Sequence, residues 1–234
     1  MKRMVLVALI TAWCVLTGIA FLYLRQPATA PMPSATPPPA IDVAGLTAKA
    51  EQGDAQAQTR LGKAFAQGEG VAQDYKQAAR WCGQAASNGN AEAEVTFGEL
   101  CQAGQGVPRD VTNAVRWFTK AAEQGSTAAQ YDLGFMYEQG QGVRHDESLA
   151  AHWYQLAAQG GDALAQFDFG QRCILGVGVP QDPIEGLKWL LLAGAQGQGD
   201  ARAKAESVQK GMAGAQIAEA KHRAAAFVPR ATGR

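Results

Sequence analysis

A spacing of 36 residues recurs along this chain and aligns nine positions in four copies. The clearest of these positions hold a tryptophan, a glycine and an aspartate in every copy. They are Trp81, Trp117, Trp153 and Trp189; Gly62, Gly98, Gly134 and Gly170; and Asp74, Asp110, Asp146 and Asp182. A fixed period between about 20 and 50 residues is typical of stacked repeats. Because such stacks expose a long surface instead of enclosing a pocket, the period favours a binding scaffold over an enzyme.

Each copy has the pattern of two helices joined by a glycine turn. The first helix begins at a residue whose side-chain oxygen can accept from the free N–H groups of the first turn. These residues are Asp54, Asn90, Ser126 and Asp162. The helix ends at a Gly-x-Gly-Val segment such as Gly68–Val71, where the glycines allow positive φ. The second helix begins at the aspartate column, and its apolar face carries Ala78, Trp81 and Ala85 in the first copy.

The combined pattern resembles the Sel-like repeat family, which is related to the tetratricopeptide repeat. The matching features are Ala-x-x-x-Leu-Gly, Gly-x-Gly-Val, the aspartate, the tryptophan and Ala-Ala-x-x-Gly, spread over about residues 44–200. The tetratricopeptide period is 34 residues and its signature lacks Gly-x-Gly-Val. The resemblance implies an all-α, right-handed superhelical solenoid of helix pairs that is used for protein–protein contact. In bacteria, members with this layout are often exported or envelope-anchored adaptors.

The N-terminal segment predicts a membrane anchor. Residues 4–24 are predominantly apolar and carry no charge, between Lys2-Arg3 and Arg25. As a helix this segment spans about 31 Å, close to the hydrocarbon thickness of a bilayer. The alternative is a signal peptide cut after Ala28-Thr29-Ala30, which would use a shorter apolar region. We favour an uncleaved anchor in the inner membrane, with the basic end in the cytoplasm and the repeats in the periplasm. Cleavage would give a secreted protein.

These patterns divide the chain into consecutive parts. We expect a transmembrane segment over 1–25 and, because six of the ten prolines fall in 25–41, an extended linker over 26–41. A capping helix follows over 42–52. The four repeats occupy 53–88, 89–124, 125–160 and 161–197, and capping helices with a tail occupy 198–234.

Composition and motifs argue against several other function classes. Without Lys2, Arg3 and Arg25, the chain has 18 basic and 21 acidic residues, which is not the charge of a nucleic-acid-binding protein. The three histidines are scattered, which argues against a metal site. The glycine pairs do not form Gly-x-Gly-x-x-Gly, so no nucleotide site is expected, and we expect no other cofactor or small-molecule substrate. Ser207 and Lys210 match a Ser-x-x-Lys nucleophile motif, but no Ser-Asp-Asn or Lys-Thr-Gly accompanies them.

The cysteines beyond the anchor are predicted to be free thiols. Cys82, Cys101 and Cys173 are odd in number. Across the turn between helices, Cys101 lies about five residues from the level of Cys82, which is too far for disulfide geometry. Cys101 and Cys173 share a column with Phe65, and so are interpreted as small core residues.

Specificity is expected at the columns where the four copies differ. On the first helices these columns should line the concave surface, where we expect another protein or a peptide to bind. The candidate partner-binding residues are Arg60, Lys63, Glu99, Asp132, Phe135, Met136, Asp168, Gln171 and Arg172. Phe135 is the best anchor candidate, because its column is otherwise charged or polar; the alternative is that it packs against a neighbouring repeat.

The sequence therefore predicts a membrane-anchored, extracytoplasmic scaffold without catalytic residues, serving as an adaptor in a bacterial cell-envelope complex. Two alternatives stay open. One is a hydrolase acting on the cell wall or β-lactams through Ser207 and Lys210. The other is a secreted effector, released by cleavage of the N-terminal segment.

Overall fold

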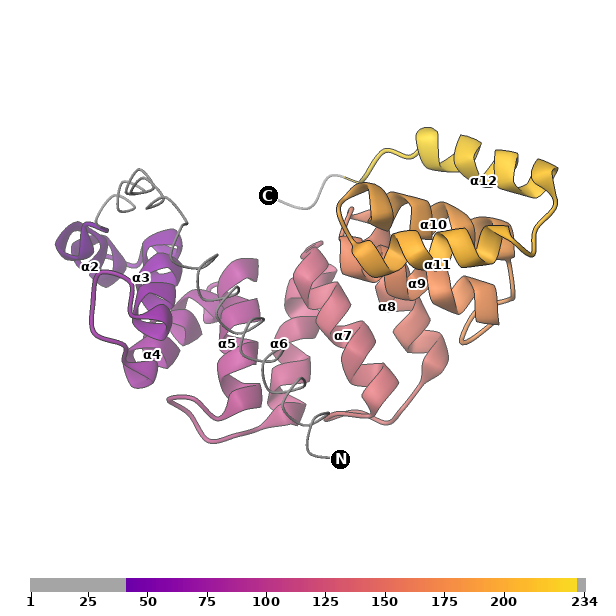
Figure 1. Ribbon diagram of the computed structural model, residues 1–234. Coiled ribbons are helices and arrows are strands. Elements are labelled where there is room, and N and C mark those ends of the chain that lie inside the picture. Colours follow the sequence, from indigo (N-terminus) through magenta and orange to yellow (C-terminus); the bar gives the residue numbers. More distant parts are fainter. Residues whose placement is uncertain (1–40, 231–234) are drawn as a thin grey trace, which may run out of the picture. The chain divides into compact units, whose positions relative to one another are not determined.

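The computed structural model describes residues 41–230, which contain eleven helices and no strand (Figure 1). The helices are α2 (Val43–Glu51), α3 (Ala55–Gln67), α4 (Tyr75–Ser87), α5 (Ala91–Ala103), α6 (Val111–Glu123), α7 (Thr127–Gln139), α8 (Glu147–Gln159), α9 (Ala163–Leu175), α10 (Pro183–Ala195), α11 (Gly199–Gln209) and α12 (Gly214–Ala225). The all-helical class is thus confirmed. The predicted transmembrane segment lies outside the described residues, as does all of the predicted linker except Ile41. Between residues 41 and 230, none of the helices is both long and apolar enough to cross a membrane.

The helices stack in chain order as a solenoid. Each repeat contributes one pair, α3 with α4, α5 with α6, α7 with α8 and α9 with α10, and the second helix of each pair packs on the first helix of the next. The first helices α3 and α5 also touch each other. Successive first helices therefore form one side of the stack, which we call the first-helix face.

The helix ends follow from the residues predicted to cap them. A carboxylate oxygen of Asp54 accepts from the N–H groups of Gln56 and Ala57 at 2.9 and 3.1 Å. Asp74 caps α4 in the same way, and the same bonding recurs in the other repeats. Gly68 ends α3 in the left-handed region, with φ of 72°. Such caps satisfy backbone groups that a helix end leaves unpaired.

The tryptophan column is buried at the two ends of the stack and only partly buried in the middle. Trp81 is 5% exposed under α2, and Trp189 is 2% exposed beneath Phe227. Trp117 and Trp153 are only partly buried. The physical reason is that the terminal helices cover only the end repeats, whereas Trp117 is covered by the Lys120 side chain, whose ammonium lies 4.1 Å from the ring centroid.

The Gly-x-Gly-Val loops also join neighbouring repeats. The second glycine of the loop, Gly106, lies directly against the first turn of α4 in the preceding repeat. A Cβ atom at this position would overlap the carbonyl oxygen of Tyr75. The loop glycine therefore permits close backbone contact between repeats in addition to reversing the chain.

Candidate partner-binding face

The first-helix face carries a groove between three successive repeats. A cavity of about 510 Å³ is lined by residues of α3, α5 and α7 and by the turn before α7. Lys63 and Glu99, two of the predicted binding residues, lie in its wall. The Lys63 ammonium also donates to Glu92 at 2.6 Å, so this cation is partly neutralised by a neighbouring repeat. The groove therefore offers more free negative than positive charge.

Four carboxylates continue this face from α5 to α9, and we call them the acidic strip: Glu99, Asp132, Asp162 and Asp168. Burial, together with the charges of Glu99 and Asp162, raises the pKa of Asp132 to about 6. Burial also raises the pKa of Asp168, although the Tyr131 hydroxyl donates to its carboxylate at 3.2 Å. Carboxylates from three repeats are thus close enough to repel one another. A cationic partner would relieve that repulsion.

Three exposed apolar side chains lie on helices that also carry residues of the acidic strip. Phe135 is 40% exposed on α7, one helical turn after Asp132. Leu164 and Leu175 on α9 are 48% and 64% exposed. Ala128, which occupies the column of Leu164, and Gln67, which occupies the column of Leu175, line the groove described above. Neither leucine is predicted from the sequence as a binding residue. Each is nevertheless an apolar residue in an otherwise polar or small column, which is the signal that indicated Phe135.

Two predicted binding residues do not lie on an accessible surface. Met136 is 1% exposed inside the core cluster between α6 and α7, and Arg172 is 6% exposed. Their column, which includes Ala64 and Leu100, is buried in every repeat because it faces the second helices. The prediction that Met136 and Arg172 are available to a partner is therefore wrong.

Arg172 is held inside the protein by ion pairs with the preceding repeat. Its guanidinium bonds the carboxylate of Glu138 at 2.6 Å and that of Glu147, and it lies 5.1 Å from the centre of the Tyr154 ring. The Tyr154 hydroxyl donates to Glu138 at 2.7 Å. Two carboxylates and an aromatic face compensate for the burial of this charge. The cluster therefore links the third and fourth repeats.

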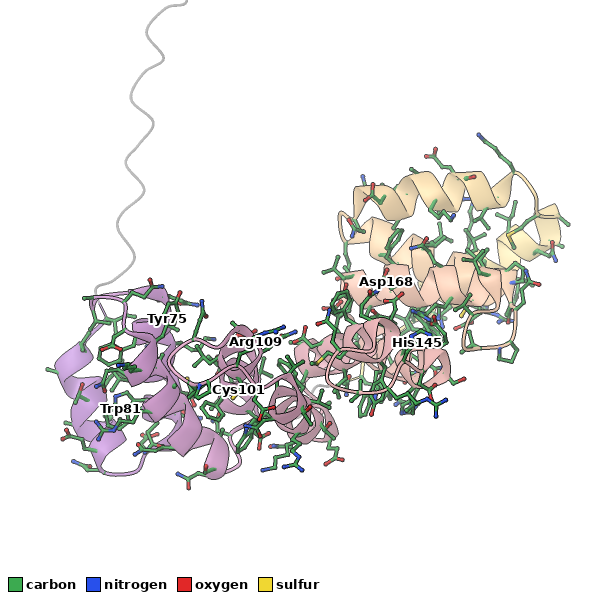
Figure 2. All side chains as sticks on the ribbon, turned by 90° about the horizontal axis from the view of Figure 1, so that it is seen from below. Tyr75, Trp81, Cys101, Arg109, His145 and Asp168 are labelled. Atoms are coloured by element: carbon green, nitrogen blue, oxygen red, sulfur yellow. The ribbon has the colours of Figure 1, made fainter. Side chains whose placement is uncertain are left out.

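The remaining predicted residues lie at the edges of this face. Arg60 is exposed on α3 beside a second hollow that Glu92 also lines. Gln171 is half-buried on α9, and Asp168 lies on the same helix (Figure 2). The structure thus brings Asp132 close to Glu99 and Asp162, and Asp162 in turn close to Asp168. Phe135 lies one helical turn after Asp132.

The residues considered for chemistry are separate from this face. Ser207 on α11 and Lys210 at its end are both exposed. Cys82, Cys101 and Cys173 are buried and free, as predicted, and burial raises the pKa of Cys82 to about 12. Within residues 41–230, the structure contains no group of three or more His, Cys, Asp or Glu side chains placed to hold a metal ion.

Comparisons with known proteins agree with this architecture. The Sel1 repeat family matches residues 55–90, 97–126, 127–162 and 163–198, so the chain belongs to that family. Sel1 repeat proteins generally mediate protein–protein interaction and are typically not catalytic. No protein of curated function matches the chain significantly.

Two solved structures show the same repeat fold. The protective antigen c5321 of uropathogenic Escherichia coli is 38% identical over 67% of this chain and 34% of its own, with a TM-score of 0.64. A Sel1 repeat protein of Oxalobacter formigenes is 34% identical over 71% of this chain and 48% of its own, with a TM-score of 0.67. The chain thus spans about a third of the first protein and about half of the second.

Proposed function

We propose that this protein is a membrane-anchored scaffold outside the cytoplasm that binds a basic, amphipathic segment of another envelope protein. The observation that carries the proposal is the exposed Phe135 beside the acidic strip. Apolar residues without a partner next to like charges that repel one another form a surface suited to a cationic segment with an apolar side. The apolar residues 4–24 support the anchor. The resemblance to envelope adaptors supports the location.

The test compares Phe135→Ala with Leu149→Ala. Both side chains are 40% exposed, but Leu149 lies on the second helix α8. Removing a central aromatic anchor costs about 2 kcal/mol or more, which lowers affinity about thirtyfold. A photo-crosslinker placed at the first-helix face captures the partner in cells, and mass spectrometry of the crosslinked product identifies it. Recovery of that partner should fall with Phe135→Ala and stay unchanged with Leu149→Ala. Equal recovery with both variants, at equal protein levels, would refute the proposed face.

The anchor is tested separately. N-terminal sequencing of the mature protein should begin at or next to Met1, and the protein should fractionate with the inner membrane. A mature chain that begins at Pro31 would instead identify a secreted protein. That result would remove the anchor from the proposal and leave the binding face intact.

A further inference from the structure

The C-terminal tail folds back onto the fourth repeat. The Phe227 ring packs edge-on against Trp189, with centroids 5.1 Å apart, and the Lys188 ammonium lies 5.6 Å from the centre of the Phe227 ring. Farther along, the N–H of Arg230 donates to the carbonyl of Gln159 at 2.8 Å. Pro229 lies beside Gly161. We call this surface of α8, α9 and α10 the tail site.

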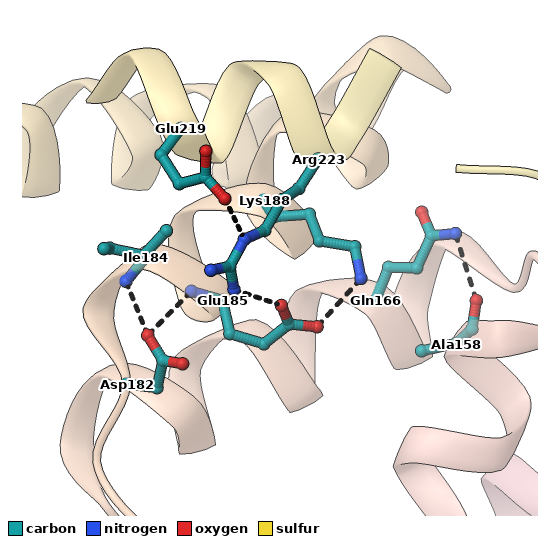
Figure 3. A network of polar contacts seen from close by, with 8 residues as sticks. All are labelled: Ala158, Gln166, Asp182, Ile184, Glu185, Lys188, Glu219 and Arg223. Carbon is teal, nitrogen blue, oxygen red and sulfur yellow. Dashed lines mark hydrogen bonds and ion pairs between the residues drawn. The ribbon is translucent and has the colours of Figure 1, made fainter. Parts of the chain in front are cut away.

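Ion pairs position the helix that carries the tail. Arg223 of α12 donates to Glu219 at 2.7 Å and to Glu185 of α10 at 3.5 Å (Figure 3). Glu185 also accepts from Lys188 at 2.8 Å. This network holds α12 on α10 and thereby fixes where the tail, Phe227–Arg230, starts.

The first repeat has the same surface without a tail. A cavity of about 650 Å³ borders α2, α3 and α4, and we call it the first-repeat cavity. Its wall includes Ala50, Glu51, Gln58, Arg80, Trp81 and Gln84. Three repeats later, the same columns hold Ala158, Gln159, Gln166, Lys188, Trp189 and Leu192 of the tail site.

The space that the tail fills in the fourth repeat is open in the first. Gly161 has Pro229 about 3.4 Å from where a Cβ atom would stand, whereas no atom lies within 4 Å of that position at Gly53. Gly53 and Gly161 share the left-handed conformation, with φ of 90° and 97°. The backbone conformation is therefore alike at these two glycines.

The wall of the first-repeat cavity also contains an unsatisfied buried acceptor. Gln58 is 5% exposed and its amide donates to the carbonyl of Ala50 at 3.0 Å, but its side-chain oxygen has no donor. In the fourth repeat, the oxygen of Gln166 accepts from Gln196 at 2.9 Å. Asn88 stands in that column in the first repeat and is one methylene shorter. A buried acceptor without a donor destabilises the fold.

We propose that the first-repeat cavity binds an extended segment of another protein with the chemistry of the tail: an aromatic residue, a proline two positions later, and then a basic residue. The aromatic ring packs against Trp81 beside Arg80, as Phe227 packs edge-on against Trp189 beside Lys188. The proline fills the space beside Gly53. The N–H of the basic residue donates to the carbonyl of Glu51, and its side chain pairs with the Glu51 carboxylate, which replaces the neutral Gln159 of the tail site.

The occupant is another protein and not the tail of a second copy. In each copy Phe227–Arg230 is already seated in its own tail site, at the high effective concentration of a tethered segment. Moving it to a neighbouring chain would give up the contacts of its own tail site and add the entropy loss of association. The cavity is lined largely by α4, a second helix, so this site is distinct from the acidic strip and Phe135.

The test uses a fluorescent synthetic peptide with the sequence of residues 224–234, titrated with the full-length protein in mild detergent. Anisotropy should show saturable binding with one peptide per chain. A peptide with alanine in place of the phenylalanine should bind about tenfold more weakly or worse. Glu51→Lys should weaken binding about tenfold through loss of a charge-assisted contact. Its matched control, Glu123→Lys, changes the same column at the end of the second repeat and should leave affinity unchanged.

Two further variants separate this site from the other surfaces. Gln84→Leu copies Leu192 of the tail site and should tighten binding severalfold. Phe135→Ala should have no effect, so failure of the proposed partner-binding face and failure of this site are distinguishable. A photoreactive phenylalanine in the peptide should crosslink to residues 80–88.

Three results would overturn the proposal. The first is peptide anisotropy that does not saturate at ~1 mM protein, which corresponds to ~4 kcal/mol of binding free energy. The others are equal effects of Glu51→Lys and Glu123→Lys on affinity, and crosslinks from the peptide to residues 188–196. Sedimentation of the unliganded protein tests whether the tail of a second copy occupies the cavity. If it self-associates and Phe227→Ala abolishes the association, the cavity binds a second copy, and the proposal of another protein is wrong.

Discussion

The second glycine of each Gly-x-Gly-Val loop provides a graded test of how the repeats are joined. Gly70, Gly106, Gly142 and Gly178 have φ between 70° and 74°. Alanine at any of them therefore incurs the same left-handed strain, about 1–2 kcal/mol. What differs is the neighbouring atom that the new methyl group would meet.

The space around these glycines decreases in a definite order. A Cβ atom at Gly70 would lie 3.5 Å from its nearest neighbour, which is an ordinary contact. At Gly142 the nearest atom is the carbonyl oxygen of Val111 at 2.8 Å, which requires a small shift. At Gly106 and Gly178 the methyl group would overlap a backbone carbonyl of the preceding second helix. Because backbone cannot rotate away as a side chain can, the two repeats must separate.

The expected losses follow from adding strain and overlap. Gly70→Ala should destabilise the protein by about 1–2 kcal/mol, from strain alone. Gly106→Ala adds overpacking, typically about 1–3 kcal/mol, and should lose about 2–5 kcal/mol in total. Gly142→Ala should lie between them.

Urea unfolding of the full-length chain, followed by circular dichroism at 222 nm, measures the overall loss. Because repeat stacks can unfold in parts, amide hydrogen exchange in α4 and α5 should be measured as well. For Gly106→Ala, the fastest increase in exchange should fall at the contact between these repeats. Equal losses for Gly70→Ala and Gly106→Ala would show that only φ matters, and would refute the packing role of the loop.

Three further predictions concern single side chains. Asn88→Gln should stabilise the protein by about 1 kcal/mol in urea unfolding, because it gives Gln58 a donor; no gain would mean that the acceptor is already satisfied. Folded Asp132, with a pKa of about 6 instead of 3.8, holds more protons than the unfolded chain between these values, so its contribution to stability falls as pH rises through that window. Asp132→Asn should therefore raise the melting temperature above pH 6 and have little effect near pH 3; the reverse order would refute the assignment. Cys82 and Cys173, whose pKa values burial raises to about 12, should resist iodoacetamide at pH 8 until urea unfolds the chain, as peptide mass mapping can check; rapid labelling of the folded protein would contradict their burial.

The features predicted correctly from sequence depend on local chemistry repeated in four copies. A capping oxygen such as that of Asp54 acts within three residues of its own position, and a left-handed glycine such as Gly68 acts at a single residue. Neither requires knowledge of what lies across the fold. Four agreeing copies then distinguish these structural positions from chance.

The errors fall where a side chain depends on another repeat. Variation in its column predicts Arg172 at the surface, yet that column faces the second helices. Only the fold brings Glu138 and Glu147 to its guanidinium. Met136 was misplaced for the same reason, because one residue along a helix turns the side chain by about 100°. Variation within a column therefore reports altered packing as readily as altered binding.

The tail site could not be found from the repeat pattern, because Phe227–Arg230 lie beyond the last repeat. Once the position of the tail is known, however, the 36-residue period allows the occupied tail site to be compared with the equivalent first-repeat cavity. The fourth repeat satisfies Gln166, fills the space beside Gly161 and covers Trp189 with an aromatic ring.

The first repeat keeps the equivalent backbone and tryptophan, but the acceptor of Gln58 is unpaired and the space beside Gly53 is empty. It also has glycine and glutamine where the fourth repeat has Leu191 and Leu192. The Gln58 acceptor is unpaired, although glutamine in place of Asn88 would satisfy it without adding apolar surface; the tail site also has unpaired buried groups, on Gln159 and Trp189. Local features that reduce stability without serving the fold are expected where a protein binds something. The difference between two copies of one surface thus identifies a binding site more specifically than either copy does alone.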